Sequence, residues 1–137
     1  MSQSHAAQML HTHPNPQPAA LDKIAACITA LQDCAQACTS CADADLSERD
    51  LKSMVRCVRL NNDCADLCGV TVRLLSRPSM AAPEVWAAQL QACITAMRVC
   101  ADECERHAKH HEHCRVCAET CRECEQACSA VLGMIRH

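Results

Sequence analysis

The cysteines of this chain follow one repeated spacing. The pattern C-x₆-C-x₃-C occurs four times in 137 residues, at Cys27/Cys34/Cys38, Cys57/Cys64/Cys68, Cys93/Cys100/Cys104 and Cys117/Cys124/Cys128. Intervals of seven and four return a side chain to the same face of an α-helix, so each occurrence predicts a row of thiols along one helix. The remaining cysteines are Cys41, Cys114 and Cys121, which brings the total to fifteen. Four rows facing one another would line a core with sulfur.

Thiols spaced in this way are suited to binding a soft metal ion. Cysteines four residues apart on a helix have β-carbons roughly 5–6 Å apart, and rotamer changes can bring both sulfur atoms onto one ion. Cu(I) is the ion of the first transition row that thiolate and thioether ligands select most strongly. One Cu(I) per thiolate would leave the core neutral, whereas buried thiolates without matching charge would be very costly. We interpret the pattern as a store for many Cu(I) ions.

Other structural roles for the cysteines agree less well with the pattern. A buried cysteine often serves as a small hydrophobic residue, but fifteen in register would pack poorly and invite oxidation. Structural zinc is usually held by four ligands on turns that wrap around the ion, and helical rows are rigid. A disulfide scaffold is disfavoured by the odd number of cysteines, although bonds between helices remain geometrically allowed.

Candidate ligands other than cysteine gather near one end of the rows. His107 continues the third row, and His111 and His113 lie in the turn before the fourth. We expect these three histidines to form an uptake site for the metal, although a histidine cluster at a helix end is often only a solvated cap. Met54 offers a thioether nearby, where plain packing would explain it equally well. Asn61 lies between two cysteines of the second row, and a structural hydrogen bond is its expected role.

Four helices are predicted to position these residues. Cysteine and apolar positions at helical spacing indicate four helices. The first covers residues 18–43, the third 84–107 and the fourth 112–135. The second begins after a helix cap within residues 45–48 and ends near residue 76. Three alternating prolines in residues 1–19 predict a flexible or loosely docked tail without a regular helix. The chain is therefore expected to consist of this tail and one domain over residues 20–137.

Short connections between helices of this length favour an all-α fold, an antiparallel up-down-up-down four-helix bundle with a cysteine-lined core. The segment ACITA occurs in both the first and the third predicted helix, so the chain looks like a duplicated helical hairpin. In this topology the histidines gather with Cys41 and Cys114 at one open end. Apolar residues such as Trp86 and Leu90 gather at the opposite, closed end.

Composition excludes several classes of partner. The formal net charge is −3 and the thirteen Lys and Arg residues are scattered, so no surface for nucleic acid or anionic membranes is expected. The first 21 residues lack the pattern of a secretory signal, and no segment is apolar enough to span a membrane. We therefore expect a cytoplasmic protein, in the compartment where thiols stay reduced.

The four cysteine rows resemble those of the bacterial copper storage proteins, specifically the cytosolic branch, over about residues 20–135. This resemblance implies a four-helix bundle that binds many Cu(I) ions through inward-facing thiolates and assembles into a tetramer. It also implies an open end bearing His or Met and an apolar closed end. We further expect the copper to leave by the route it entered, to a copper chaperone or another acceptor protein. The recurrent C-x₃-C ligand pairs carry over as Cys34/Cys38, Cys64/Cys68, Cys100/Cys104, Cys117/Cys121 and Cys124/Cys128.

Three other functions compete with copper storage. A metallothionein-like buffer for zinc or cadmium would differ in metal stoichiometry and in competition between metals. A thiol redox protein would need a few accessible cysteines of low pKa rather than a uniform buried set. An oxidase of the di-iron type would carry the Glu-x-x-His motif, which is absent from the sequence. We expect storage without catalytic turnover, and hence no enzyme.

Overall fold

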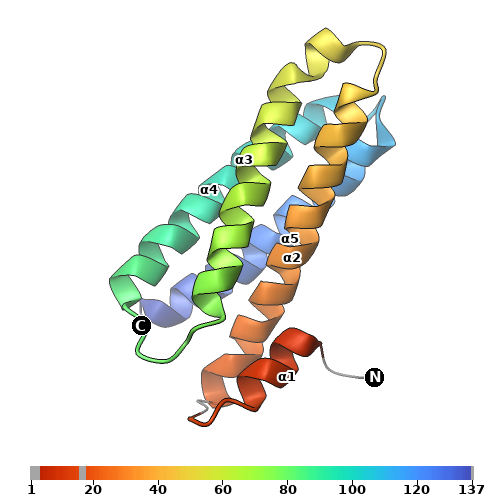
Figure 1. Cartoon of the computed structure of the whole chain (residues 1–137). Helices are drawn as coiled ribbons and strands as arrows, with labels where there is room; N and C mark the ends of the chain where they lie inside the picture. The colour runs from red at the N-terminus through yellow and green to blue at the C-terminus, as the bar shows by residue number, and fades with distance from the viewer. Residues whose placement is uncertain (1–3, 16–17, 137) are drawn as a thin grey trace.

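The computed structural model describes residues 4–15 and 18–136, and within these ranges the only regular elements are helices. The predicted all-helical class is therefore confirmed. Figure 1 shows one short helix followed by four long ones. Their bounds are α1 His5–His11, α2 Pro18–Leu46, α3 Leu51–Leu75, α4 Pro83–His107 and α5 Glu112–Ile135.

The four long helices enclose the core. Figure 1 shows that α2 and α4 run in one direction and that α3 and α5 run in the opposite one. Helix α2 packs against α3 and α5, and α4 packs against the same two helices, whereas the backbones of the diagonal pairs do not approach within 8 Å in the described residues, and these pairs meet only through side chains. Each long helix therefore turns one face toward a shared interior, and that face is the one carrying its row of cysteines.

The ends of these helices differ from prediction at one connection. The segment 45–48 was expected to cap the second long helix, but α2 continues through Asp45 to Leu46. Asp45 is fully buried four residues after Cys41, so the inner face of α2 extends one further turn. The residue preceding α3 is Asp50, whose side chain makes no capping hydrogen bond. The start of α4 matches its sequence, with Pro83 in the first turn, where a missing N–H is tolerated.

The helix α1 is a feature that the sequence analysis missed. The hydroxyl of Ser4 accepts a hydrogen bond from the backbone N–H of Ala7 at 3.1 Å and caps the helix. Leu10 is buried against α2, and His11 pairs with Asp22 at 2.9 Å. The prediction of no regular helix before residue 20 is therefore wrong for residues 5–11, because the prolines follow this helix and do not interrupt it. Residues 1–3 and 16–17 of the predicted tail lie outside the described residues.

The two ends of the interior have different chemistry. Leu75, Trp86 and Leu90 are buried at the end where α2 begins, as predicted. This apolar end also contains a hollow of about 430 Å³ between the α3–α4 connection and the last turns of α5. The opposite end is built from the end of α2, the start of α3, the end of α4 and the start of α5. None of the helices in the described part of the chain is long and apolar enough to cross a bilayer.

Candidate metal centre

All fifteen cysteines are buried and none takes part in a disulfide bond. The helical spacing explains this placement, because each interval of three, four or seven residues returns the thiol to the inner face of its helix. Thirteen of the fifteen side chains have no measurable exposure, and Cys41 and Cys117 are 2% and 1% exposed. The structure thus brings together every cysteine that the sequence marked as a candidate ligand.

The sulfur atoms are close enough to share metal ions. In the middle of the core, Cys34 Sγ lies 3.9 Å from Cys38 Sγ and 3.7 Å from Cys121 Sγ. Two sulfurs that each lie about 2.3 Å from one ion are at most about 4.6 Å apart. The observed separations therefore fit a bridging ion after small rotamer changes.

Groups of three and four potential ligands follow one another along the core. Within each group, all of the ligand atoms lie within 4.8 Å of one another. Four of these groups consist only of cysteines: Cys34/Cys38/Cys64/Cys121, Cys38/Cys100/Cys117/Cys121, Cys34/Cys68/Cys124 and Cys41/Cys104/Cys117. Because several cysteines belong to two groups, an ion bound in one group has a neighbouring thiol through which it can move to the next.

Toward the apolar end the thiols come in pairs. Cys27 Sγ lies 3.6 Å from Cys128 Sγ, and Cys93 Sγ lies 4.0 Å from Cys68 Sγ. The first pair joins α2 to α5 and the second joins α3 to α4. The thiol core therefore reaches from the open end to the apolar residues that close the other end.

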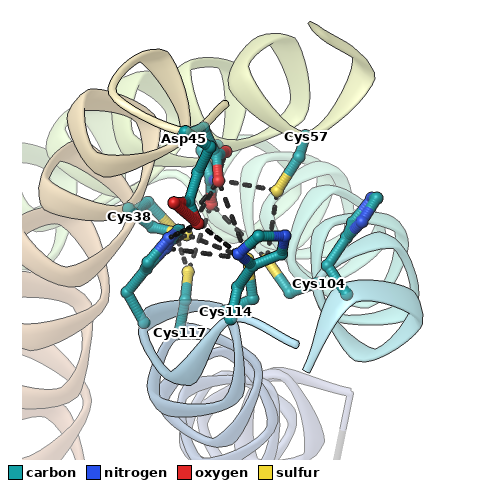
Figure 2. Close-up of polar contacts among 12 residues, drawn as sticks. Cys38, Asp45, Cys57, Cys104, Cys114 and Cys117 are labelled. Atoms are coloured by element: carbon teal, nitrogen blue, oxygen red, sulfur yellow. Dashed lines mark hydrogen bonds and ion pairs between the residues drawn. The ribbon is translucent and has the colours of Figure 1, made fainter. Parts of the chain in front are cut away.

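At the open end a carboxylate joins the thiols. Figure 2 shows Asp45 among Cys38, Cys57, Cys104, Cys114 and Cys117. Asp45 Oδ1 lies 3.6 Å from Cys114 Sγ, and Asp45, Cys41, Cys57 and Cys114 form another potential ligand group. Burial raises the pKa of the Asp45 carboxyl. The sequence analysis placed Asp45 in a helix cap, but its spacing of four from Cys41 is a signal that could have identified it.

Asn61 links the thiols of three helices. Its side-chain amide donates to Cys57 Sγ at 3.3 Å and to Asp45 Oδ2 at 3.4 Å. Its carbonyl oxygen accepts from Cys100 and Cys117, each at 3.1 Å. The expected structural hydrogen bond is thus a network that joins α3 to α2, α4 and α5.

The thiols are not electrostatically equivalent. The pKa of the Cys93 thiol is raised to about 12, chiefly by its hydrogen bond with Cys128 and to a smaller extent by burial. Hydrogen bonds with Cys104 and Cys114 lower the pKa of Cys41, at the open end. A low pKa favours the thiolate, which is the form that binds metal. Cys41 is therefore the better placed of these two thiols to bind an arriving ion.

The three predicted uptake histidines occupy different positions at the open end. His113 Nδ1 lies 3.4 Å from Cys41 Sγ and 3.7 Å from Cys114 Sγ, so this histidine contacts the thiol core. His107 Nε2 pairs instead with the carboxylate of Glu103 at 2.8 Å. His111 Nδ1 contacts the carboxylate of Glu48.

Two further residues lie on the helices that build this end, Met54, which was predicted, and Glu103, which was not. Met54 is fully buried near the start of α3. Glu103, the partner of His107, is only 8% exposed. The sequence analysis did not consider Glu103, although its spacing of four from His107 on one helix would have paired the two side chains.

Comparison with known proteins agrees with this thiol-lined interior. A model of the copper storage protein family matches residues 20–133. This chain belongs to that family. The resemblance proposed from the cysteine rows is thereby confirmed.

Two solved structures of family members are closely similar. The copper storage protein Ccsp from Streptomyces lividans, loaded with 10 copper equivalents, superimposes with a TM-score of 0.90 at 47% identity, covering 93% of this chain and 98% of that one. A cytosolic copper storage protein from the same organism, with five coppers, superimposes with a TM-score of 0.84 at 50% identity, covering 85% and 98%. An uncharacterized cysteine-rich protein of Bacillus subtilis, YhjQ, is 33% identical over 106 residues, which is 77% of this chain and 93% of that protein.

Proposed function

We propose that this chain stores Cu(I) in the cytosol, inside an antiparallel four-helix bundle, and holds the ions for later release. The observation that carries this proposal is the burial of all fifteen free thiols, at least twelve of which belong to groups whose ligand atoms lie within 4.8 Å of one another. Cu(I) accepts two or three soft ligands, and neighbouring thiols supply them without any change of fold. The role is storage, and no catalytic turnover is required of the protein.

The charge balance of the core favours a monovalent ion. Each thiolate that replaces a thiol adds one negative charge to an interior from which water is largely excluded. One Cu(I) per thiolate cancels that charge, whereas zinc fully ligated by four thiolates leaves a net negative site. The groups of four cysteines, such as Cys34/Cys38/Cys64/Cys121, do offer the coordination number that zinc prefers. A zinc buffer is therefore the second candidate.

A metal titration separates the two candidates. The fully reduced protein is titrated anaerobically with Cu(I) against a coloured chelator, with zinc in a parallel series, and bound metal is counted per chain. Copper storage predicts uptake of roughly one Cu(I) per thiol or more, and much less zinc. Saturation at a few copper ions, or a preference for zinc, would refute copper storage.

We further propose that copper enters at the histidine end. His113 contacts Cys41 and Cys114, and His107 and His111 lie beside it at the same end, with His111 and His113 ring centroids 5.8 Å apart. An imidazole can hand an ion to a neighbouring thiolate, which then passes it inward by exchange between thiols. Met54, buried at the same end, would add a thioether ligand.

The uptake route is tested by kinetics. Replacement of His107, His111 and His113 by Ala should slow copper loading more than it lowers the final copper content, because the thiols remain. His110→Ala is the matched control, since His110 is exposed in the same turn. A triple variant that loads as fast as the native chain would remove the uptake proposal.

The family resemblance also suggests a tetramer, and release of the stored copper requires an acceptor protein or a chelator. Exposed apolar residues at the start of α3 and the end of α2 support an assembly, since Leu46 and Val55 are 57% and 59% exposed. Sedimentation velocity of the native chain tests this proposal. A monomer at micromolar concentration would contradict it.

A further inference from the structure

The open end carries a second set of ligands that the thiol core does not include. A hollow of about 500 Å³ lies between the α2–α3 connection and the α4–α5 connection. Its lining includes three carboxylates, of Glu48, Asp50 and Glu112, against one guanidinium, of Arg49, together with the imidazoles of His111 and His113. Nitrogen and carboxylate oxygen ligands with excess negative charge suit a borderline divalent cation better than they suit Cu(I).

Three of these ligand atoms converge on one point. His111 Nδ1 and His113 Nε2 both contact the same oxygen of Glu48, Oε2, the latter at 3.3 Å. Ligand atoms about 2.1 Å from a tetrahedral zinc ion lie about 3.4 Å from one another. The separation between His113 Nε2 and Glu48 Oε2 is therefore that of two ligands on one ion. The side chains of the three residues are only 14% to 29% exposed, so water competes little.

The other nitrogen of each imidazole faces a carboxylate. His111 Nε2 lies 3.5 Å from Asp50 Oδ2, and His113 Nδ1 lies 3.7 Å from Asp45 Oδ1 and 3.4 Å from Cys41 Sγ. In zinc proteins, a carboxylate on the far nitrogen fixes the tautomer and the orientation of the ligating histidine. His111 and His113 thus each have a carboxylate near the ring nitrogen that would not ligate the ion.

We propose that His111 Nδ1, His113 Nε2 and Glu48 form a binding site for a divalent cation of the Zn²⁺ class, with a fourth position open to water. Three protein ligands and one open position are typical of zinc sites that exchange their fourth ligand. The site uses none of the fifteen thiols. Because it occupies two of the uptake histidines, bound zinc competes with the admission of Cu(I), and this consequence rests on the proposed function.

The zinc site is tested first in the reduced, copper-free protein by ¹⁵N NMR of the histidine rings. With zinc added beyond the amount that the thiol groups bind, we expect the nitrogen shifts of direct coordination at Nδ1 of His111 and Nε2 of His113. Glu48→Gln should weaken this binding by about 100-fold or more, and Asp50→Asn, which is the milder change, by about 10- to 100-fold. Glu112→Gln is the matched control, because Glu112 lines the same hollow but bonds Arg115. Histidine shifts that do not respond to zinc would overturn the site.

The competition is tested by the ratio of copper loading rates with and without zinc. At a zinc concentration ten times the dissociation constant, mass action leaves the site free in about one chain in eleven, so loading should slow about tenfold. The ratio should return to near one in Glu48→Gln and stay unchanged in Glu112→Gln. Equal ratios in the native chain and Glu48→Gln would overturn the competition. A native chain that takes up no copper, yet shows the histidine shifts, would overturn the proposed function and leave the zinc site established.

Discussion

The substitution Asn61→Leu tests whether one buried amide organises the thiol core before metal arrives. Leucine has the same number and branching of side-chain heavy atoms as asparagine, but it is larger and has no polar atoms. In the native chain the amide donates to Asp45 and Cys57 and accepts from Cys100 and Cys117. The variant removes these four interactions and the longer one that the amide oxygen accepts from Cys104 at 3.8 Å, and it leaves the buried Asp45 carboxylate with one donor fewer.

The expected loss of stability follows from the energetics of unsatisfied buried groups. A buried polar group that loses its partner costs about 1–3 kcal/mol, and thiols are weak donors, so Asp45 dominates the sum. We therefore expect the free energy of unfolding of the reduced, copper-free chain to fall by about 1–3 kcal/mol. For a chain of this length the corresponding fall in Tm is about 3–10 °C.

The matched control is Asn62→Leu, because Asn62 is the next residue on the same helix and is exposed. Both variants exchange the same residue types and gain the same helix propensity, so the difference between them reports what the buried position contributes, that is, the lost network together with the packing of the larger leucine. Thermal unfolding of both reduced proteins, followed by circular dichroism, is the measurement. Equal Tm values for the two variants would refute the reasoning, since the amide would then contribute nothing to the fold.

Two further predictions separate the two ends of the core. Leu90 lies at the apolar end and is 1% exposed, so Leu90→Ala should lower the free energy of unfolding by about 2–5 kcal/mol. Val85 is on the same helix but 53% exposed, so Val85→Ala should change the free energy of unfolding by less than about 0.5 kcal/mol. Chemical denaturation checks both variants, and a similar loss in the two would contradict the assignment of a packed apolar end. Cys41→Ser, beside His113, should slow the first phase of copper uptake, whereas Cys27→Ser, beside Cys128, should lower the copper content and leave the initial rate unchanged. Stopped-flow loading followed by metal analysis compares the pair, and an equal slowing in both would argue against uptake at the histidine end.

Much of the fold and of the candidate site could be predicted from the sequence because helical periodicity is a local property. An interval of four or seven residues fixes which face of a helix a cysteine occupies, whatever the helix packs against. All fifteen cysteines are accordingly buried, and the predicted α5 bounds agree with the structure. The errors fell where a local signal was ambiguous. Asp45 is a residue type that commonly caps a helix, yet it is buried on the inner face of α2, and α2 continues past it to Leu46. The proline pattern concealed α1, whose order depends on the contact of Leu10 with α2.

The sequence by itself determined the thiol rows, the soft-metal chemistry and the number of ligands available. Residue type and spacing along one chain are sufficient for these properties, since they follow from the helix repeat and from ligand softness. Only the tertiary structure decided which thiols of different helices meet, that His113 contacts the thiols whereas His107 and His111 face carboxylates, and that Glu48 joins two imidazoles. Distances between side chains on different helices depend on how the helices pack, and no spacing within one helix specifies them.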